Sequence, residues 1–513
     1  MILILICVCL VVLYFYGTKN YNYWSKKGIK FEKPIAFFGG NLKVFIDKVS
    51  LSERFAALYR KYSDEKFVGF YDGRNPAILI RDPELIKHVL INDFRYFHKR
   101  GLNPDESDTE PLLKNIFSAD GDVWKLMRQK LTTIFSSGKL KAMFPLIVER
   151  TKKLEQLAYN LAESNEEVDV RELLARYTTD VIGVCGFGID SAALDDKNSD
   201  FRKLGKRIVA GNRRDRIVTF FKIIFPEIFK YLHFVAPDVE KKIFSFVTQI
   251  MSLRNHVPSG RKDFIDLMME LKQKGNIIGE SIEKKNTDGS PKTIELELDD
   301  QMITAHVFLF YAAGFDTSSS ASSFLLHKLA YYPEVQERCQ KEVDEVLKKY
   351  DEKLCFDAIK EMKYLEMAFQ ESMRLFPSPG FLQRKCVSKY TFPGTSVAVD
   401  KDTYVIISIE GLGSDKKFFD DPEEFRPERF HPANTELIKK CTFMPFGGGP
   451  RSCIGERMGI MQSLAGVSTI IRNFTLSPSR SSVSKPRIDP TSDIVQHIIG
   501  GLPLALTPRN KIN

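Results

Sequence analysis

Residues 445–455 surround a single cysteine with glycines and read Pro445-Phe446-Gly447-Gly448-Gly449-Pro450-Arg451-Ser452-Cys453-Ile454-Gly455. Because glycine has no Cβ, the three glycines before Cys453 allow the backbone to approach a flat ligand closely. Beyond Cys453 the apolar side chains recur at helical spacing, at Ile454, Met458, Met461 and Leu464. The pattern therefore predicts that the thiol lies close to the N-terminus of a helix.

Such a position suits a reactive or ligating thiol. The free N–H groups at a helix N-terminus and the helix dipole stabilise a thiolate. With no second Cys or His close by in the sequence, a thiolate at Cys453 suits an axial haem ligand better than a zinc site. The alternative is a glycine-rich turn that holds a buried structural cysteine. We predict a functional thiolate.

The composition excludes several classes of protein. The chain has 513 residues, of which 43% are apolar and 27% are charged. These values are typical of folded soluble proteins and exclude a mainly disordered chain, a fibre and a multi-span membrane protein. The net charge of +9 is small for this length, so we expect no nucleic-acid partner. None of the eight cysteines forms a C-x-x-C pair, which argues against a disulfide framework or a zinc module.

Residues 1–16 form an uncharged apolar stretch, MILILICVCLVVLYFY. As a helix it would be about 24 Å long, close to the thickness of the endoplasmic reticulum bilayer. Lys19, Lys26 and Lys27 follow it and no basic residue precedes it, so the positive-inside rule places the rest of the chain on the cytoplasmic face. We predict a transmembrane anchor at 1–16 and a basic, aromatic linker at 17–40. A cleaved secretory signal is the alternative, but it would need a basic start and a small-residue cleavage site.

Residues 41–513 are predicted to form one large, mainly α domain with a small β portion. Apolar side chains at i, i+3, i+4 spacing indicate helices at residues 83–92, 123–135, 146–163, 264–271 and 298–331, with a further helix opened by Pro333. Two β-prone runs, 67–71 and 77–80, flank Asp72-Gly73 and predict a hairpin. A strand is expected at 397–409, and a strand or loop at 498–506. The polar stretches 276–293 and 477–492 are predicted to be exposed loops.

Residues 217–235, IVTFFKIIFPEIFKYLHFV, are unusually rich in aromatic side chains. They could contact a membrane, form the roof of a substrate cavity, or simply be buried core. Pro226 argues against a continuous membrane span.

Four further motifs could carry chemistry. The first, Ala312-Ala313-Gly314-Phe315-Asp316-Thr317-Ser318, lies in the helix predicted at 298–331, where Ala313 and Gly314 would leave room for a ligand. The others place charged or polar side chains on a common helix face or soon after it, and read Glu371-Ser372-Met373-Arg374, Pro427-Glu428-Arg429-Phe430 and Trp124-Lys125-Leu126-Met127-Arg128. Each motif alone has an ordinary explanation: a surface ion pair, a solvated arginine, or a Thr317 hydroxyl bonded to its own helix.

Together with the cysteine segment, these motifs resemble the haem-thiolate monooxygenases, the cytochrome P450 family. The family's pattern F-x-x-G-x-x-x-C-x-G is matched in full, and the other motifs occur in the family's order, so the resemblance covers essentially the whole chain. It implies the cytochrome P450 fold and haem b (iron protoporphyrin IX), with Cys453 as the iron ligand. The other cofactor-binding residues that it implies are Trp124, Arg128, Ala313, Arg384, Phe446, Gly449, Arg451 and Gly455. Of these, Trp124 and the three arginines would bind the propionates.

The resemblance also implies roles in catalysis and folding. Thr317 would hydrogen-bond dioxygen and Asp316, where the family more often has Glu, would relay protons from solvent. Glu371, Arg374 and Arg429 would form a structural triad beneath the haem. Two stretches depart from the family's pattern: the proline-rich hinge is reduced to Lys33-Pro34, and residues 411–417 lack the usual His and Pro.

The function implied is a microsomal monooxygenase that inserts one atom of dioxygen into a lipophilic small molecule, either a xenobiotic or an endogenous lipid or hormone. Because no flavin or nicotinamide fingerprint is evident, electrons would come from an NADPH–cytochrome reductase, with cytochrome b5 as a second candidate partner. A basic face formed by Lys439, Lys440, Arg451 and Arg457 would suit an acidic partner.

Two other functions stay open from the sequence. One is a family member that rearranges peroxides as an isomerase or lyase, and the other is a membrane-anchored haem or lipid-binding protein without turnover. The sequence most resembles animal, particularly insect, enzymes that handle foreign compounds. The candidate substrate-pocket residues are Phe117, Phe220, Phe308 and Phe381, although core packing explains an apolar aromatic equally well.

Overall fold

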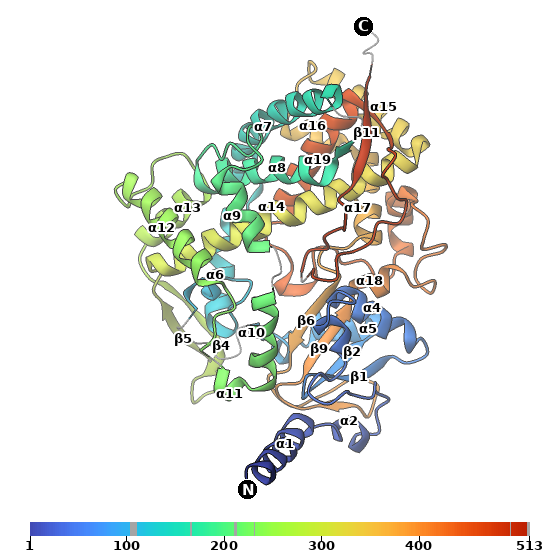
Figure 1. Cartoon of the computed structure of the whole chain (residues 1–513). Coiled ribbons are helices and arrows are strands. Elements are labelled where there is room, and N and C mark those ends of the chain that lie inside the picture. The colour runs from blue at the N-terminus through green and yellow to red at the C-terminus, as the bar shows by residue number, and fades with distance from the viewer. Residues whose placement is uncertain (103–109, 165–166, 210–212, 230, 493, 510–513) are drawn as a thin grey trace.

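Helix α14 (Asp300–Tyr331) is the longest helix among the described residues and runs through the middle of the helical part of the molecule (Figure 1). The computed structural model describes residues 1–102, 110–164, 167–209, 213–229, 231–492 and 494–509. The Asp299 side chain caps the first turn of α14 by accepting from the backbone N–H of Met302, and the helix ends just before Pro333. Helices α8 (Val170–Ile182), α17 (Lys363–Leu375) and α19 (Glu456–Asn473) pack around α14. Most of its side chains are therefore buried.

The remaining helices surround this centre or lie towards the N-terminus. They are α1 (Ile2–Thr18), α2 (Tyr23–Lys26), α3 (Leu42–Phe45), α4 (Leu51–Lys61), α5 (Pro83–Lys87), α6 (Gly121–Ile134), α7 (Ser137–Ser164), α9 (Asp200–Val209), α10 (Arg213–Ile224), α11 (Pro226–Phe229), α12 (Pro237–Leu253), α13 (Phe264–Gln273), α15 (Pro333–Lys349), α16 (Phe356–Glu361) and α18 (Ile409–Gly413). The helices predicted at 123–135, 146–163, 264–271 and 298–331 are confirmed, as is the helix opened by Pro333. The helix predicted at 83–92 is α5 followed by a π-helical turn, His88–Asn92.

A four-stranded sheet forms the second part of the molecule, in the strand order β1-β2-β9-β6. Its strands are β1 (Phe67–Asp72), β2 (Asn75–Ile80), β9 (Tyr404–Ser408) and β6 (Phe381–Lys385). The predicted hairpin is confirmed, because β1 and β2 are antiparallel and Asp72 pairs with Asn75. β2 and β9 run parallel, and β6 pairs with β9 in the antiparallel sense, with Arg384 opposite Val405.

The prediction of a loop at 276–293 is wrong. This stretch forms most of an antiparallel hairpin, β4 (Ile277–Lys285) and β5 (Pro291–Leu296), closed by a turn at Asp288-Gly289. The hairpin is polar because it is largely exposed. It packs on α6, where Asp122 accepts from the Ser281 hydroxyl at 2.8 Å and from the Ile282 N–H at 2.7 Å. The strand expected at 397–409 is interrupted by a turn and is divided between β8 (Ala398–Val399), which pairs with β7 (Tyr390–Thr391), and β9.

The last sheet joins the C-terminal segment to the helical part, in the order β10-β11-β3. β10 is Phe474–Pro478, β11 is Pro503–Pro508 and β3 is Val168–Asp169. The β11 strand confirms the strand alternative for 498–506, and the segment 479–492 has no strand or helix.

Helix α1 begins at Ile2 and ends at Thr18, and most of its apolar side chains are exposed. It lies beside α11 at the lower edge of Figure 1, where the Tyr16 hydroxyl donates to Glu227 at 2.6 Å. The rings of Tyr16 and Phe225 are stacked with their centroids 5.4 Å apart. Among the described residues, no helix combines the length and the apolar character needed to cross a membrane.

The aromatic stretch 217–235 forms α10 and α11 and the turn that follows, with Lys230 outside the described residues. Ile217, Ile228 and Tyr231 are exposed, whereas Val218 and Ile224 are buried. The stretch is therefore not simply core, and its exposed apolar side chains leave a membrane or substrate contact open.

Two hydrophobic cores meet at the cysteine segment. The larger core lies among the helices and includes Met458 and Met461 of α19, whereas the smaller core lies on the sheet and includes Cys441 and Met444. The chain between Met444 and Met458 passes from one core to the other, so Cys453 lies at their boundary.

Candidate active site

The backbone around Cys453 favours glycine at one position and requires it at another. Gly447 and Gly449 have φ values of +77° and +70°, and a Cβ on Gly449 would lie 1.9 Å from the carbonyl oxygen of Leu90. The Cys453 N–H donates to the carbonyl of Phe446 at 2.8 Å and closes the segment into a loop. Helix α19 begins at Glu456, so the thiol lies just before a helix N-terminus, as its sequence predicts.

The Cys453 thiol is free and exposed, yet protein atoms surround it closely enough for burial to raise its pKa. The Glu456 carboxylate also raises this pKa, whereas a backbone hydrogen bond from Gly455 and the charges of Arg128 and Arg100 act in the opposite direction and favour the thiolate. Solvent can therefore reach the cysteine, although the many protein atoms around the sulfur reduce the solvation of its charged form. The thiol is accessible to a ligand and is flanked by groups that stabilise its anion.

Four arginines gather near this thiol: Arg384 and Arg451 are buried, and Arg100 and Arg128 are partly buried. Arg128 donates to the carbonyl of Ser452 at 2.7 Å, one residue before the cysteine. Burial lowers the pKa of Arg100 to about 10 and that of Arg451 to about 9. Burial, together with repulsion from Arg100 and Arg451, holds the pKa of Arg384 well below its usual value. Burial and mutual repulsion therefore disfavour the positive charge of the cluster, and a bound anion would stabilise it.

Part of the hydrogen-bonding capacity of this cluster is unused. Arg384 Nε and Arg451 Nη1 are buried and have no hydrogen-bond partner among the described residues. The anions that act on the four guanidinium groups are Asp120 and Cys453. Once Cys453 is deprotonated, two positive charges stay unmatched.

These residues fit haem b. Its two propionates would supply the two missing negative charges and acceptors for the unpaired arginine N–H groups. Cys453 would supply the iron ligand. The Trp124 ring packs on Phe94, with centroids 5.6 Å apart, and the Arg451 guanidinium lies 4.3 Å from its centroid, so Trp124 contacts an arginine of the cluster.

Glu371, Arg374 and Arg429 form a buried ion-pair network. Both Glu371 oxygens accept from Arg374, at 2.7 and 2.8 Å, and Arg429 Nε lies 3.2 Å from the same carboxylate. The Glu371 and Arg374 side chains are almost fully buried. Arg374 also donates to the carbonyl of Gly413 at 2.6 Å, so the divergent stretch 411–417 packs directly against the network.

Helix α14 presents Ala313 and Thr317, one turn apart, as less buried positions in an otherwise buried helix. The Thr317 hydroxyl donates to the carbonyl of Ala313 at 2.6 Å, which is the arrangement of the alternative interpretation. Its oxygen still has lone pairs that can accept a hydrogen bond.

Gly314 does not leave room for a ligand, contrary to the expectation from sequence. A Cβ at Gly314 would lie 2.4 Å from Ile182 of α8, and its carbonyl accepts from the Gln462 side chain at 2.8 Å. The glycine therefore allows α8 to pack closely on α14.

Asp316 is buried and paired. Arg171 of α8 donates to its Oδ1 at 2.6 Å, and His497 Nε2 lies 3.3 Å from its Oδ2. The Arg171 guanidinium and the hydrogen bond with His497 outweigh the effect of burial and lower the pKa of Asp316 to about 2. The carboxylate is therefore ionised at neutral pH and points to Arg171 and His497.

The four candidate pocket phenylalanines each have a different neighbour. Phe117 lies by the arginine cluster, with the Arg100 guanidinium 4.7 Å from its ring centroid, and Phe308 lies on α14. Phe220 packs on Phe45, with centroids 4.6 Å apart, and Phe381 packs on Phe55 at 4.9 Å. A shared substrate pocket for these four side chains stays a prediction.

Arg451 is one predicted docking residue that the structure contradicts. It is buried beneath the Cys453 loop and cannot contribute to a basic surface, whereas Lys439, Lys440 and Arg457 are exposed. The reason is that its guanidinium is held by Asp120 and the backbone of His98 and Ala119.

Sequence reasoning missed four residues of this region: Arg100, Asp120, Arg171 and His497. Each contacts a residue that a motif identifies, but from a distant part of the chain. The sequence gives a local indication for only two of them: the adjacent basic residues Lys99-Arg100 and the acidic residues at the start of α6, which include Asp120.

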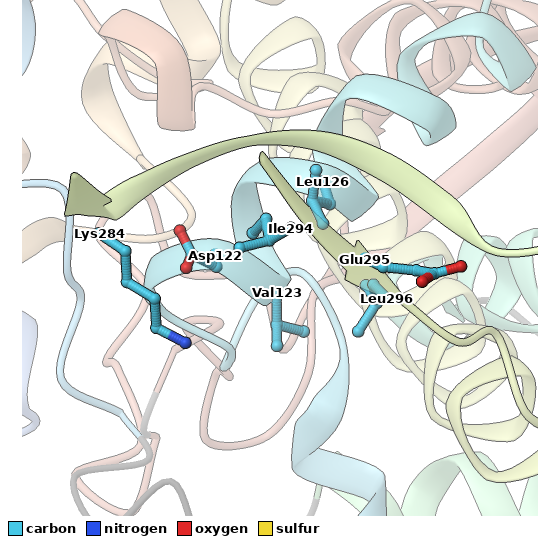
Figure 2. Close-up of a pocket in the computed structure, with 7 residues that line it drawn as sticks. All are labelled: Asp122, Val123, Leu126, Lys284, Ile294, Glu295 and Leu296. Carbon is cyan, nitrogen blue, oxygen red and sulfur yellow. The ribbon is translucent and has the colours of Figure 1, made fainter. Parts of the chain in front are cut away.

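A pocket of about 210 Å³ lies between α6 and the β4–β5 hairpin and is not lined by Cys453. Figure 2 shows its side chains, with Asp122, Val123 and Leu126 from α6 facing Ile294 and Leu296 from β5. It contains none of the residues near the thiol and is not a candidate active site.

Comparison with known proteins identifies the family of this chain. Residues 30–502 match the family model described as Cytochrome P450. Cytochrome P450 6B6 of Helicoverpa armigera is 36% identical over 99% of this chain and 98% of its own length. Cytochrome P450 6a2 of Drosophila melanogaster is 35% identical over 98% of both chains, and cytochrome P450 6k1 of Blattella germanica is 33% identical over 98% of this chain and 96% of its own. The chain belongs to the cytochrome P450 family.

Proposed function

We propose that this protein inserts one atom of dioxygen into a lipophilic small molecule, with electrons that originate from NADPH. Members of the cytochrome P450 family bind haem b and are monooxygenases, and this chain is an enzyme of that kind. When bound, the haem supplies the iron chemistry that activates dioxygen, with the second oxygen atom leaving as water. The observation that carries the proposal is the free, accessible Cys453 thiol beside an arginine cluster with two unmatched charges.

The chain's own residues have separate tasks in this proposal. Cys453 ligates the iron as a thiolate, which the N–H groups before α19 and the charges of Arg100 and Arg128 stabilise. Arg128, Arg384 and Arg451 bind the propionates and fix the orientation of the cofactor. Phe446, Gly449 and Gly455 shape the loop that presents the sulfur.

On α14, Ala313 would leave space for a ligand beside the helix, and the Thr317 hydroxyl would orient a hydrogen-bond partner there. Asp316, the residue before Thr317, transfers protons in this proposal. Its ion pair with Arg171 and its contact with His497, a side chain that is one-third exposed, connect it towards solvent. For Asp316 to pass a proton to the Thr317 side, its carboxylate must leave Arg171 transiently.

Electrons need a partner protein, and we propose a flavoprotein NADPH–cytochrome reductase, with cytochrome b5 as an alternative donor. The exposed cations Lys439, Lys440 and Arg457 lie in the segments that flank the Cys453 loop and suit an acidic partner.

We also propose that α1 and the exposed apolar side chains of 217–235 associate with the endoplasmic reticulum membrane, with the rest of the chain on the cytoplasmic side. The exposed apolar side chains of Ile2–Phe15 in α1 support this proposal. Ile228 and Tyr231 are also exposed, and they are close in sequence to Glu227, which accepts a hydrogen bond from Tyr16 of α1.

A reconstituted assay tests the reaction. The purified holoenzyme is combined with reductase, NADPH and a panel of lipophilic compounds under labelled dioxygen. Incorporation of one labelled atom per product, dependent on NADPH, is expected. Product formation without NADPH would favour an isomerase or lyase, and haem binding without any product across the panel would favour a binding protein.

A further inference from the structure

Asp120 is the carboxylate at the centre of the arginine cluster. Its Oδ1 accepts from the Arg100 backbone N–H and from Arg451 Nη2, both at 2.7 Å, and its Oδ2 accepts from the Gly101 N–H at 2.8 Å. The side chain is 4% exposed, and that of Arg451 is fully buried. One carboxylate thus joins the segment 100–101 to the loop that carries Cys453.

The position of Asp120 in the chain makes this arrangement unusual. It is the N-cap residue of α6, where an aspartate normally accepts hydrogen bonds from the first turn of its own helix. Here the Asp120 side chain makes no capping hydrogen bond. Its carboxylate oxygens instead accept hydrogen bonds from Arg451 and from the backbone N–H groups of Arg100 and Gly101. Helix α6 therefore lacks the stabilisation of a side-chain cap, and the carboxylate stabilises the arginine cluster instead.

We propose that Asp120 is a positioning residue for haem b: it holds the Arg451 guanidinium in place for a propionate, anchors the backbone of residues 100–101 beside it, and lowers the reduction potential of the iron by its negative charge. The proposal rests on haem binding at Cys453. It adds that a carboxylate from the chain itself offsets part of the cationic charge around the propionates.

The charges explain the expected effect on potential. Arg100, Arg128, Arg384 and Arg451 favour the reduced iron, which has one positive charge fewer than the oxidised iron, because nearby cations stabilise the more electron-rich state. Asp120 acts in the opposite sense and, being buried, is screened little by salt. Its removal should therefore raise the midpoint potential of the ferric/ferrous couple.

The test compares two neighbouring aspartates in the full-length holoenzyme. Asp120→Asn removes the charge and also turns an amide towards backbone N–H groups that need an acceptor. Asp122→Asn is the matched control, since Asp122 lies two residues further on and accepts from the Ser281 hydroxyl and the Ile282 N–H of the β4–β5 hairpin instead of from the arginine cluster. Asp120→Glu keeps the charge. The readouts are the midpoint potential, measured by spectroelectrochemistry, and the rate of haem transfer to an excess of apomyoglobin.

We expect Asp120→Asn to raise the midpoint potential and to release haem several-fold faster than wild type, with both values unchanged in Asp122→Asn and nearer wild type in Asp120→Glu. An unchanged or lower potential in Asp120→Asn, or an equal shift in Asp122→Asn, would overturn the proposal. If Asp120→Asn retains no haem, retention by Asp120→Glu and Asp122→Asn supports the positioning role, whereas loss from Asp120→Glu as well overturns it. The spectrum of the wild-type holoenzyme reports thiolate ligation separately, so a failure of the haem site itself is distinguished.

Discussion

The guanidinium of Arg171 lies 2.6 Å from the carboxylate of Asp316, and both side chains are largely buried between α8 and α14. Asp316 is the residue that the family resemblance assigns to proton relay. The ion pair gives it a second role, since it joins the two most closely packed helices of the molecule beside the proposed oxygen-binding side. Its energetic weight can be measured independently of catalysis.

Replacing Arg171 with methionine should destabilise the fold by about 3 kcal/mol, because an uncompensated carboxylate is left in the interior. The double variant Asp316→Asn/Arg171→Met should regain much of this loss, since no buried charge then stays unpaired. Denaturant unfolding of the four proteins in the cycle measures both values. Simple additivity of the two single variants would show that the pair does not interact.

The same pair predicts a pH dependence. The pKa of Asp316 falls from 3.8 to about 2 in the folded protein. A depressed carboxyl pKa contributes stability that is fully present above the unfolded pKa and is lost as the pH falls towards the folded pKa. The stability difference between wild type and Asp316→Asn should therefore be constant from pH 7 to pH 5 and shrink by about 2 kcal/mol between pH 4 and pH 2. A difference that stays constant down to pH 2, or grows on acidification, would contradict the ion pair.

Thr317→Ala should uncouple NADPH use from product formation, because the variant loses the hydroxyl that orients the oxygen side of the site. NADPH consumption should continue while product per NADPH falls several-fold. Thr317→Ser retains a hydroxyl and is the control, expected to stay close to wild type. Equal coupling in all three proteins would contradict the role of Thr317 in oxygen activation and indicate that its hydroxyl serves only to bond the Ala313 carbonyl.

Glu371→Gln should prevent a stable holoenzyme, because Arg374 would lose its charged partner in the interior, at a cost of about 3–5 kcal/mol. Arg426 offers a matched comparison: it is close in sequence to Arg429 but lies on the surface with Asp421 and Glu424. Arg426→Ala should cost about 0–1 kcal/mol. Thermal unfolding and haem content measure both. Glu371→Gln protein with normal haem content and stability would show that the network is dispensable.

The cysteine segment and helix α14 could be predicted from sequence because their information is local. Glycines near Cys453 are required by the backbone of the loop itself, and the small and polar residues of α14 lie within two turns. The partners of these residues could not be predicted in the same way. Arg171 and Asp316 are 145 positions apart, and nothing in either segment specifies the other.

The failures have physical causes. Gly314 is used for close packing against Ile182, and periodicity cannot say which neighbour faces a glycine. The β4–β5 hairpin is polar because it is exposed, so it lacks the apolar alternation by which strands are recognised, although its Asp288-Gly289 turn was a hairpin signal. Arg451 appeared to be a surface cation because sequence alone does not reveal that Asp120 draws it inward.

The central claim is that Cys453 ligates haem iron as a thiolate. The most direct measurement is the carbon monoxide difference spectrum of the dithionite-reduced holoenzyme, recorded for freshly prepared wild type and for Cys453→His. We predict that wild type shows the long-wavelength Soret band of thiolate-ligated haem and that Cys453→His, if it binds haem, shows the shorter-wavelength band of histidine ligation. A wild-type spectrum without the thiolate band, or a thiolate band that persists in Cys453→His, would contradict the account.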